Sequence, residues 1–270
     1  HDAIDITEQG AASREDWRAC SIDFHNNDLH VMSDDFIEAD SGTHNIRVFN
    51  NRGINAGQSG LSAQPVFGGP AYFIGNIVYH VPAGSIFKFN IYPAGILVYH
   101  NTLIGEWTSP PFSNVHVRNN LFVGTDNPDR PLFHNTSYTS YTSFDYNGWR
   151  PSPGDRAQFV WKQARDGRDY RLEDTVGGAW DSLAEFSQAT GFEQHGVLVD
   201  FDSFQNVPIP DHTRPETVYF AQQLDFRLAP DSPAIDAGCI LPNINDSYAG
   251  NAPDLGALEM GAEAVVYGPR

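Results

Sequence analysis

The chain has few cysteines, few lysines and no long apolar segment. Only two of its 270 residues are cysteines, Cys20 and Cys239, which is too few for a disulfide-held scaffold. We expect both to be buried small hydrophobic residues with no need to pair. No apolar run reaches the roughly 18 residues that a membrane-spanning helix requires, so no membrane span is expected.

Positive charge is also scarce. The chain has 16 Lys and Arg residues against 34 Asp and Glu, a formal charge of −18, and its only lysines are Lys88 and Lys162. Nucleic acids bind to positive fields, so a nucleic-acid partner is not expected. The same charge repels acidic polysaccharides at long range. Binding one would therefore need local cations or a bound metal.

An asparagine recurs through the first 150 residues at intervals of 19 to 27 residues, with an apolar residue three positions before each one. The six are Asn27, Asn51, Asn76, Asn101, Asn120 and Asn147. Apolar residues two apart indicate a strand with one buried face, and a repeat of this length predicts one coil of a parallel β-helix. We interpret the asparagines as a hydrogen-bonded internal ladder rather than as catalytic groups.

A second family of strands is predicted to follow each turn, with apolar residues inward and polar residues outward. The first outward column is Asp5, Glu38, Ser62 and Lys88. The next is Thr7, Asp40, Gln64 and Asn90. Stacked coils place the members of each column above one another.

The repeat stops after residue 150, which suggests three regions. Residues 1–150 form the coils, and residues 151–224 form an extension of loops and one short helix that packs on the solenoid. The helix is predicted over residues 182–190, because Ser182 and Glu185 form a capping box and Gly191 suits its end. Residues 225–270 are expected to cap the open end of the solenoid. Additional N-terminal coils or another subunit are expected to cover the other end, since strand edges are exposed there.

The chain resembles the right-handed parallel β-helix proteins of the pectate-lyase-like superfamily. The repeated NN and HNT turns of residues 22–150 carry this resemblance, and the FRLAP, SPAIDAG and PDLGALE segments resemble a recurrent ending of bacterial secreted β-helix proteins. The resemblance implies an all-β, right-handed, single-stranded parallel β-helix with an irregular C-terminal cap. It also implies a secreted protein, either extracellular or periplasmic.

Acidic residues concentrate around the first outward column. Asp34, Asp35, Glu38 and Asp40 lie close in sequence, and Asp5 is predicted one coil below. Calcium binds six to eight oxygen ligands, so Glu38, Asp40 and Asp5 are candidate ligands. The resemblance implies a Ca²⁺ ion that neutralises a uronate carboxylate. The alternative is a solvated acidic face.

Lys88 stands in the same column, two coils beyond Glu38. A lysine near another cation has a lowered pKa and can act as a base, while the alternative is an ordinary ion pair. Gln64 and Asn90 of the second column are candidate substrate-binding residues. Phe36 and Tyr72 are candidates for stacking on sugar rings.

These residues favour a carbohydrate-active enzyme that cleaves a uronate-containing polysaccharide or oligosaccharide by β-elimination, with Lys88 removing the α-proton. A glycoside hydrolase would instead pair Glu38 with Asp5 or Asp40. Members of the superfamily also include uronate epimerases and surface proteins without known activity. The fold alone does not choose among them.

Overall fold

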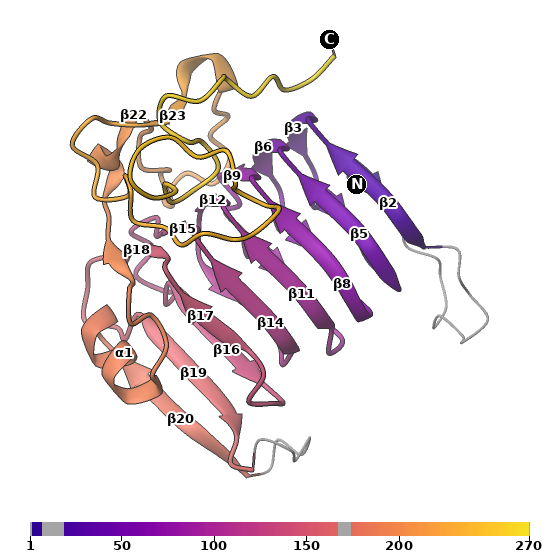
Figure 1. The fold of residues 1–270 in the computed structure, drawn as a ribbon, viewed down its shortest axis with the longest axis vertical. Coiled ribbons are helices and arrows are strands. Elements are labelled where there is room, and N and C mark those ends of the chain that lie inside the picture. Colours follow the sequence, from indigo (N-terminus) through magenta and orange to yellow (C-terminus); the bar gives the residue numbers. More distant parts are fainter. Residues whose placement is uncertain (1, 7–18, 167–173, 270) are drawn as a thin grey trace.

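The chain folds into a parallel β-solenoid of about six coils, as the asparagine repeat predicts (Figure 1). The structure is a computed structural model and describes residues 2–6, 19–166 and 174–269. Thr7 of the second outward column lies outside these residues. Within them, no helix is both long enough and apolar enough to cross a membrane.

The coils build three sides, here called sheets 1, 2 and 3. Sheet 1 begins with β1 (Ile4–Asp5), β4 (Ile37–Glu38), β7 (Leu61–Ser62) and β10 (Phe87–Lys88). The same side continues with β13 (Trp107–Thr108), β16 (Phe133–Ser137), β19 (Phe159–Ala164) and the antiparallel β20 (Thr175–Trp180). Sheet 2 contains β2 (Cys20–His25), β5 (His44–Phe49), β8 (Phe67–Ile74), β11 (Ala94–Tyr99), β14 (Ser113–Arg118) and β17 (Ser143–Asp145). Sheet 3 contains β3 (Asp28–Met32), β6 (Arg52–Ala56), β9 (Ile77–Tyr79), β12 (Thr102–Ile104), β15 (Leu121–Val123), β18 (Gly148–Arg150) and β21 (Val197–Leu198).

The predicted asparagine ladder is confirmed at the turn between sheets 2 and 3. Asn76 Nδ2 donates to Asn101 Oδ1 at 2.9 Å and to the Val48 carbonyl at 2.8 Å. The same pattern joins each asparagine to the next, from Asn27 to Asn147. The ladder ends on Glu193, whose Oε1 accepts from Asn147 Nδ2 at 2.7 Å. The turn amides are therefore satisfied inside the protein.

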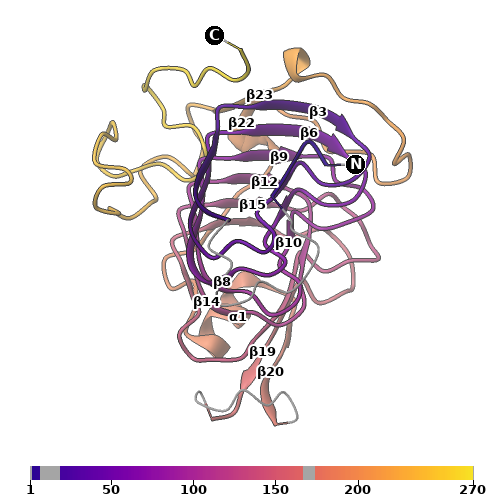
Figure 2. The same cartoon turned by 90° about the vertical axis from the view of Figure 1, so that its right-hand side faces the viewer.

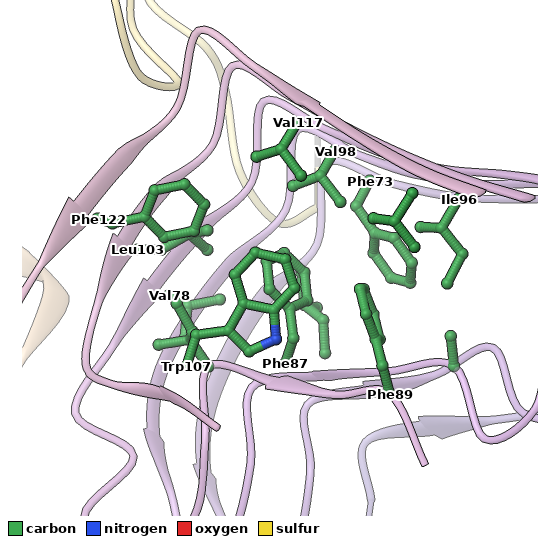
Figure 3. Close-up of a cluster of buried hydrophobic side chains, with 14 of the residues drawn as sticks. Phe73, Val78, Phe87, Phe89, Ile96, Val98, Leu103, Trp107, Val117 and Phe122 are labelled. Atoms are coloured by element: carbon green, nitrogen blue, oxygen red, sulfur yellow. The ribbon is translucent and has the colours of Figure 1, made fainter. Parts of the chain in front are cut away.

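The interior of the coils is a continuous apolar core. Val98 pairs in register with Phe73 and Val117, as the sequence columns predict, and all three are 0% exposed. Large rings from sheet 1 fill the space opposite (Figure 3). Among them, Trp107 stacks on Phe122 with ring centroids 5.6 Å apart. This packing holds the short strands of sheet 1 in place.

The far end of the coils is closed by helix α1 (Leu183–Thr190), which lies beyond β19 and β20 (Figure 1). The predicted Ser182–Glu185 capping box is present, and Gly191 ends the helix in the left-handed conformation at φ 77°. Leu183 and Phe186 are buried in the same core as the coil interior. The helix therefore supplies the cap that was expected from residues 225–270.

The C-terminal segment, here residues 201–269, instead covers the outer face of sheet 3. It contains the 3₁₀ turns η1 (Phe201–Ser203) and η2 (Ala221–Gln223) and the strands β22 (Phe204–Asn206) and β23 (Asp225–Leu228). Phe226 and Leu255 pack with Tyr79 and Leu121 of sheet 3 in a second apolar cluster. Figure 2 shows this segment, in orange and yellow, on the side of the solenoid where the strands of sheet 3 lie. Apolar side chains such as Tyr79 and Leu121 lie on the outer face of sheet 3, and this segment covers them.

The two cysteines do not pair. No disulfide joins Cys20 to Cys239, and both are half-buried, so the expectation of full burial is not met.

A polar groove on sheet 1 as the candidate functional site

The outward column of sheet 1 has the register that the sequence predicts. Asp5 pairs with Glu38, Glu38 with Ser62, and Ser62 with Lys88. Residues on either side of these positions, such as Ile37 and Phe87, are 0% exposed, so the column faces away from the core. Because the apolar residues beside them must face the core, the polar side chains of the column must point outward.

Lys88 reaches back across Ser62 to two carboxylates. Its Nζ lies 2.6 Å from Asp35 Oδ2 and hydrogen-bonds to Glu38. Asp35 is 0% exposed, and the Lys88 side chain is 20% exposed. The ammonium is therefore part of a largely buried ion-pair network.

The pKa values of Lys88 and Glu38 are shifted in ways that give the two residues different protonation behaviour. Burial opposes the charge of Lys88, but the hydrogen bonds that its ammonium donates to Asp35 and Glu38 raise its pKa above the ordinary value. Burial raises the pKa of Glu38 to about 7, against the hydrogen bond from Lys88 and with the help of nearby Asp40. Lys88 thus keeps its proton at neutral pH, whereas Glu38 can gain or lose one. This arrangement does not suit Lys88 as a base.

Asp40 is buried and hydrogen-bonded within the protein. It is 2% exposed, and its Oδ1 accepts from Ser62 Oγ at 2.5 Å and from the Gln64 amide at 2.7 Å. Burial raises the pKa of Asp40 to about 6 against these bonds. Gln64 Oε1 in turn accepts from Asn90 Nδ2 at 2.8 Å, so the second outward column forms its own hydrogen-bonded row.

The acidic end of the column brings three carboxylates together. Oxygens of Asp2, Asp5 and Glu38 all lie within 4.8 Å of one another. Such a group suits a hard cation that prefers oxygen ligands, but Lys88 already occupies Glu38. Asp40, a predicted ligand, is not in this group, and Asp2 was missed because no repeat column contains it.

The two aromatic candidates lie elsewhere. Phe36 is 1% exposed and belongs to the core, so its ring offers no face to a sugar. Tyr72 is half-buried on the outer face of sheet 2, in register with Arg47 and Leu97. The structure therefore does not bring either ring to the Lys88 column.

A groove of about 540 Å³ opens next to Lys88 on sheet 1. Thr108 and His134 line it and continue the outward column, since they pair in register. Arg130 and Arg156 approach from the turns that follow, and Asn90 lies at the side. The groove therefore gathers the cationic and polar side chains of several coils.

More positive than negative side chains line the groove, although the protein is strongly acidic: Lys88, Arg130 and Arg156 stand with one carboxylate, Asp129. Arg130 donates to the Ala83 carbonyl at 2.9 Å, and Arg156 donates to the Pro128 carbonyl at 3.2 Å. Neither arginine has a carboxylate partner within residues 2–6, 19–166 and 174–269. Both guanidinium groups are thus bound by carbonyl oxygens rather than by a carboxylate, and Asp129 is the acidic residue that lines the groove beside them.

His134 adds a group that can accept a proton. Burial and the charge of Lys162 lower its pKa, so the imidazole is neutral at pH 7. The side chain is exposed to the groove. Sequence reasoning missed His134 because the strand family was followed only as far as Lys88. One more step along the column, through Thr108, would have reached it.

Comparison of the chain with models of protein families, with curated proteins and with solved structures gave no match. The fold defines the protein as a parallel β-solenoid with a cationic groove on one side.

Proposed function

We propose that the protein binds a uronate-containing polysaccharide or oligosaccharide in the sheet 1 groove and cleaves it by β-elimination. The supporting observation is a pair of arginines, Arg130 and Arg156, that form no ion pair with the described residues and line a groove of about 540 Å³ in a chain of net charge −18. An acidic polymer is repelled by most of this surface. Local cations are the feature that lets one bind here.

The reaction needs a cation at the uronate carboxylate and a base at the α-carbon. Arg130 or Arg156 would pair with the carboxylate, which lowers the pKa of the α-proton. His134, neutral at pH 7, would take that proton, and the bond to the leaving sugar oxygen would then break to give an unsaturated uronate. Lys88 would stay protonated and hold Glu38 and Asp35 in position.

Calcium remains part of the proposal, with Asp2, Asp5 and Glu38 as its candidate ligands. Bound there, it would add positive charge beside the groove. Its removal by a chelator is expected to weaken substrate binding more than it changes the fold. The protein is proposed to act outside the cytoplasm, where such polymers occur.

The test is the ultraviolet absorbance of the unsaturated product on uronate polymers. We expect His134→Gln to lower turnover at least about 10²-fold, the usual contribution of a general base. The matched control His212→Gln, in the exposed C-terminal segment, should keep full turnover. Lys88→Arg should lose less than tenfold. Loss of turnover in Lys88→Arg with retention in His134→Gln would return the base role to Lys88.

Paired carboxylates support glycoside hydrolysis as a second candidate. Asp5 and Glu38 present oxygens within 4.8 Å, and retaining hydrolases hold their carboxyl groups about 5 Å apart. Burial also raises the pKa of Glu38 to about 7, which suits a general acid. New reducing ends without an unsaturated product would favour this reaction.

A further inference from the structure

A second group of polar side chains lies on the outer face of sheet 2, away from the groove. His116 of β14 pairs in register with Ser143 of β17. Their neighbours Val117 and Phe144 point into the core at 0% and 2% exposure, so His116 and Ser143 face outward. Nothing in the proposed elimination uses these residues.

Three hydrogen bonds connect the group. His116 Nδ1 lies 2.8 Å from Ser143 Oγ, and His116 Nε2 lies 3.1 Å from Asn114 Oδ1. Arg118 Nη2 donates to Ser143 Oγ at 2.9 Å. Asn114 Oδ1 can only accept, so Nε2 carries the ring proton and Nδ1 accepts from the Ser143 hydroxyl, whose oxygen also accepts from Arg118. The Nε2 proton then goes to Asn114, which fixes the tautomer.

We propose that Ser143, His116 and Asn114 form a serine–histidine–asparagine triad that hydrolyses small acyl esters, such as O-acetyl groups on a carbohydrate. Ser143 is the nucleophile, His116 is the base, and Asn114 positions the imidazole. A nucleophile within hydrogen-bond reach of a base, with a third group orienting that base, is the arrangement such catalysis requires.

The surroundings suit each role. Burial and the charge of Arg118 lower the pKa of His116, so the ring is neutral and ready to accept a proton. Ser143 is only half-buried and Asn114 is exposed, so an ester can reach the serine. On the other side of His116 the cross-strand neighbour is Leu97, an apolar residue that favours an uncharged acyl group.

The reaction proceeds in two balanced steps. Ser143 Oγ bonds to the acyl carbon while its proton moves to His116 Nδ1, and the ester C–O bond breaks as the alcohol leaves with that proton. Water then attacks the acyl-serine, giving up a proton to His116 that is returned to Ser143 Oγ. The products are the free alcohol and the carboxylic acid. Arg118 is close enough to Ser143 Oγ to stabilise the oxyanion.

The test uses the full chain with a fluorophosphonate probe and with p-nitrophenyl acetate. The probe should form one adduct, on Ser143, through a new O–P bond with loss of fluoride, as read by mass spectrometry of peptides. Ser143→Ala should lose the adduct and at least about 10²-fold of acetate hydrolysis. The control Ser113→Ala, on the same sheet, should keep both.

His116→Gln separates catalysis from folding. It should slow labelling of Ser143 by a similar factor while the melting temperature changes little. No adduct on Ser143, or unchanged hydrolysis in Ser143→Ala, would overturn the triad. Because the groove lies on sheet 1, His134→Gln should leave acetate hydrolysis intact, so failure of the triad and failure of the proposed elimination are distinguishable.

Discussion

Lys88 forms an ion pair with Glu38 across an intervening strand, passing over Ser62, and also holds the fully buried Asp35 at 2.6 Å. The backbones of Glu38 and Lys88 are two strands apart, which is about 10 Å at the spacing of stacked strands. The long lysine side chain spans this distance. One ammonium thus pairs with two carboxylates, and Lys88 stays protonated at neutral pH.

Removing this ammonium should destabilise the fold. Lys88→Met leaves Asp35 buried without a cation, and breaking a buried pair from one side costs about 3–5 kcal/mol of unfolding free energy. The control Lys162→Met, at an exposed position of β19, should stay within about 0.5 kcal/mol. Denaturant unfolding compares them. Equal stability of both variants would mean that the ion pair does not hold sheet 1.

The asparagine ladder should contribute stability without taking part in the chemistry. Asn76→Ala removes two donated bonds and leaves the Asn51 amide without its acceptor at 3.1 Å. Leaving a buried group unsatisfied costs roughly 1–3 kcal/mol. Thermal melting should show the loss, and Asn206→Ala at an exposed position should not. A variant that melts normally but loses activity would contradict the structural role.

The end of the ladder should make stability depend on pH. Burial raises the pKa of Glu193 to about 8 from an ordinary 4.5, against hydrogen bonds from Asn147. Between these values the folded state keeps a proton that the unfolded state has lost, so this group's contribution to stability falls as pH rises. Glu193→Gln cannot titrate, and its melting temperature should fall less between pH 5 and 8. An unchanged slope would show that Glu193 titrates normally.

The C-terminal segment should be needed to cover sheet 3. Leu255 is 0% exposed in the cluster with Leu121 and Tyr79, so Leu255→Ala should cost about 2–5 kcal/mol. Leu198→Ala is the control, since Leu198 is 61% exposed. Chemical denaturation measures both. If Leu255→Ala is as stable as the control, the segment is not part of the packed structure.

The sequence predicted the parts of the molecule that repeat. The asparagines and the apolar columns recur at fixed positions, so the ladder, the coils and the register of Glu38 with Lys88 followed from spacing alone. The groove was not predicted from the sequence, because Arg130 and Arg156 come from irregular turns with no equivalent in other coils. An ion pair at Lys88 was an alternative that the sequence left open, but its partners were not predicted, since spacing describes backbones and not the reach of a flexible side chain.

The central claim is that local cations recruit an acidic saccharide to an acidic protein. Calorimetric titration with a uronate oligosaccharide and with its neutral counterpart tests this most directly. The account predicts that only the uronate binds, that added salt weakens binding by screening, and that Arg156→Gln weakens it at least about tenfold, roughly the worth of one charge-assisted contact. Equal binding of the neutral oligosaccharide, or unchanged uronate binding by Arg156→Gln, would contradict it.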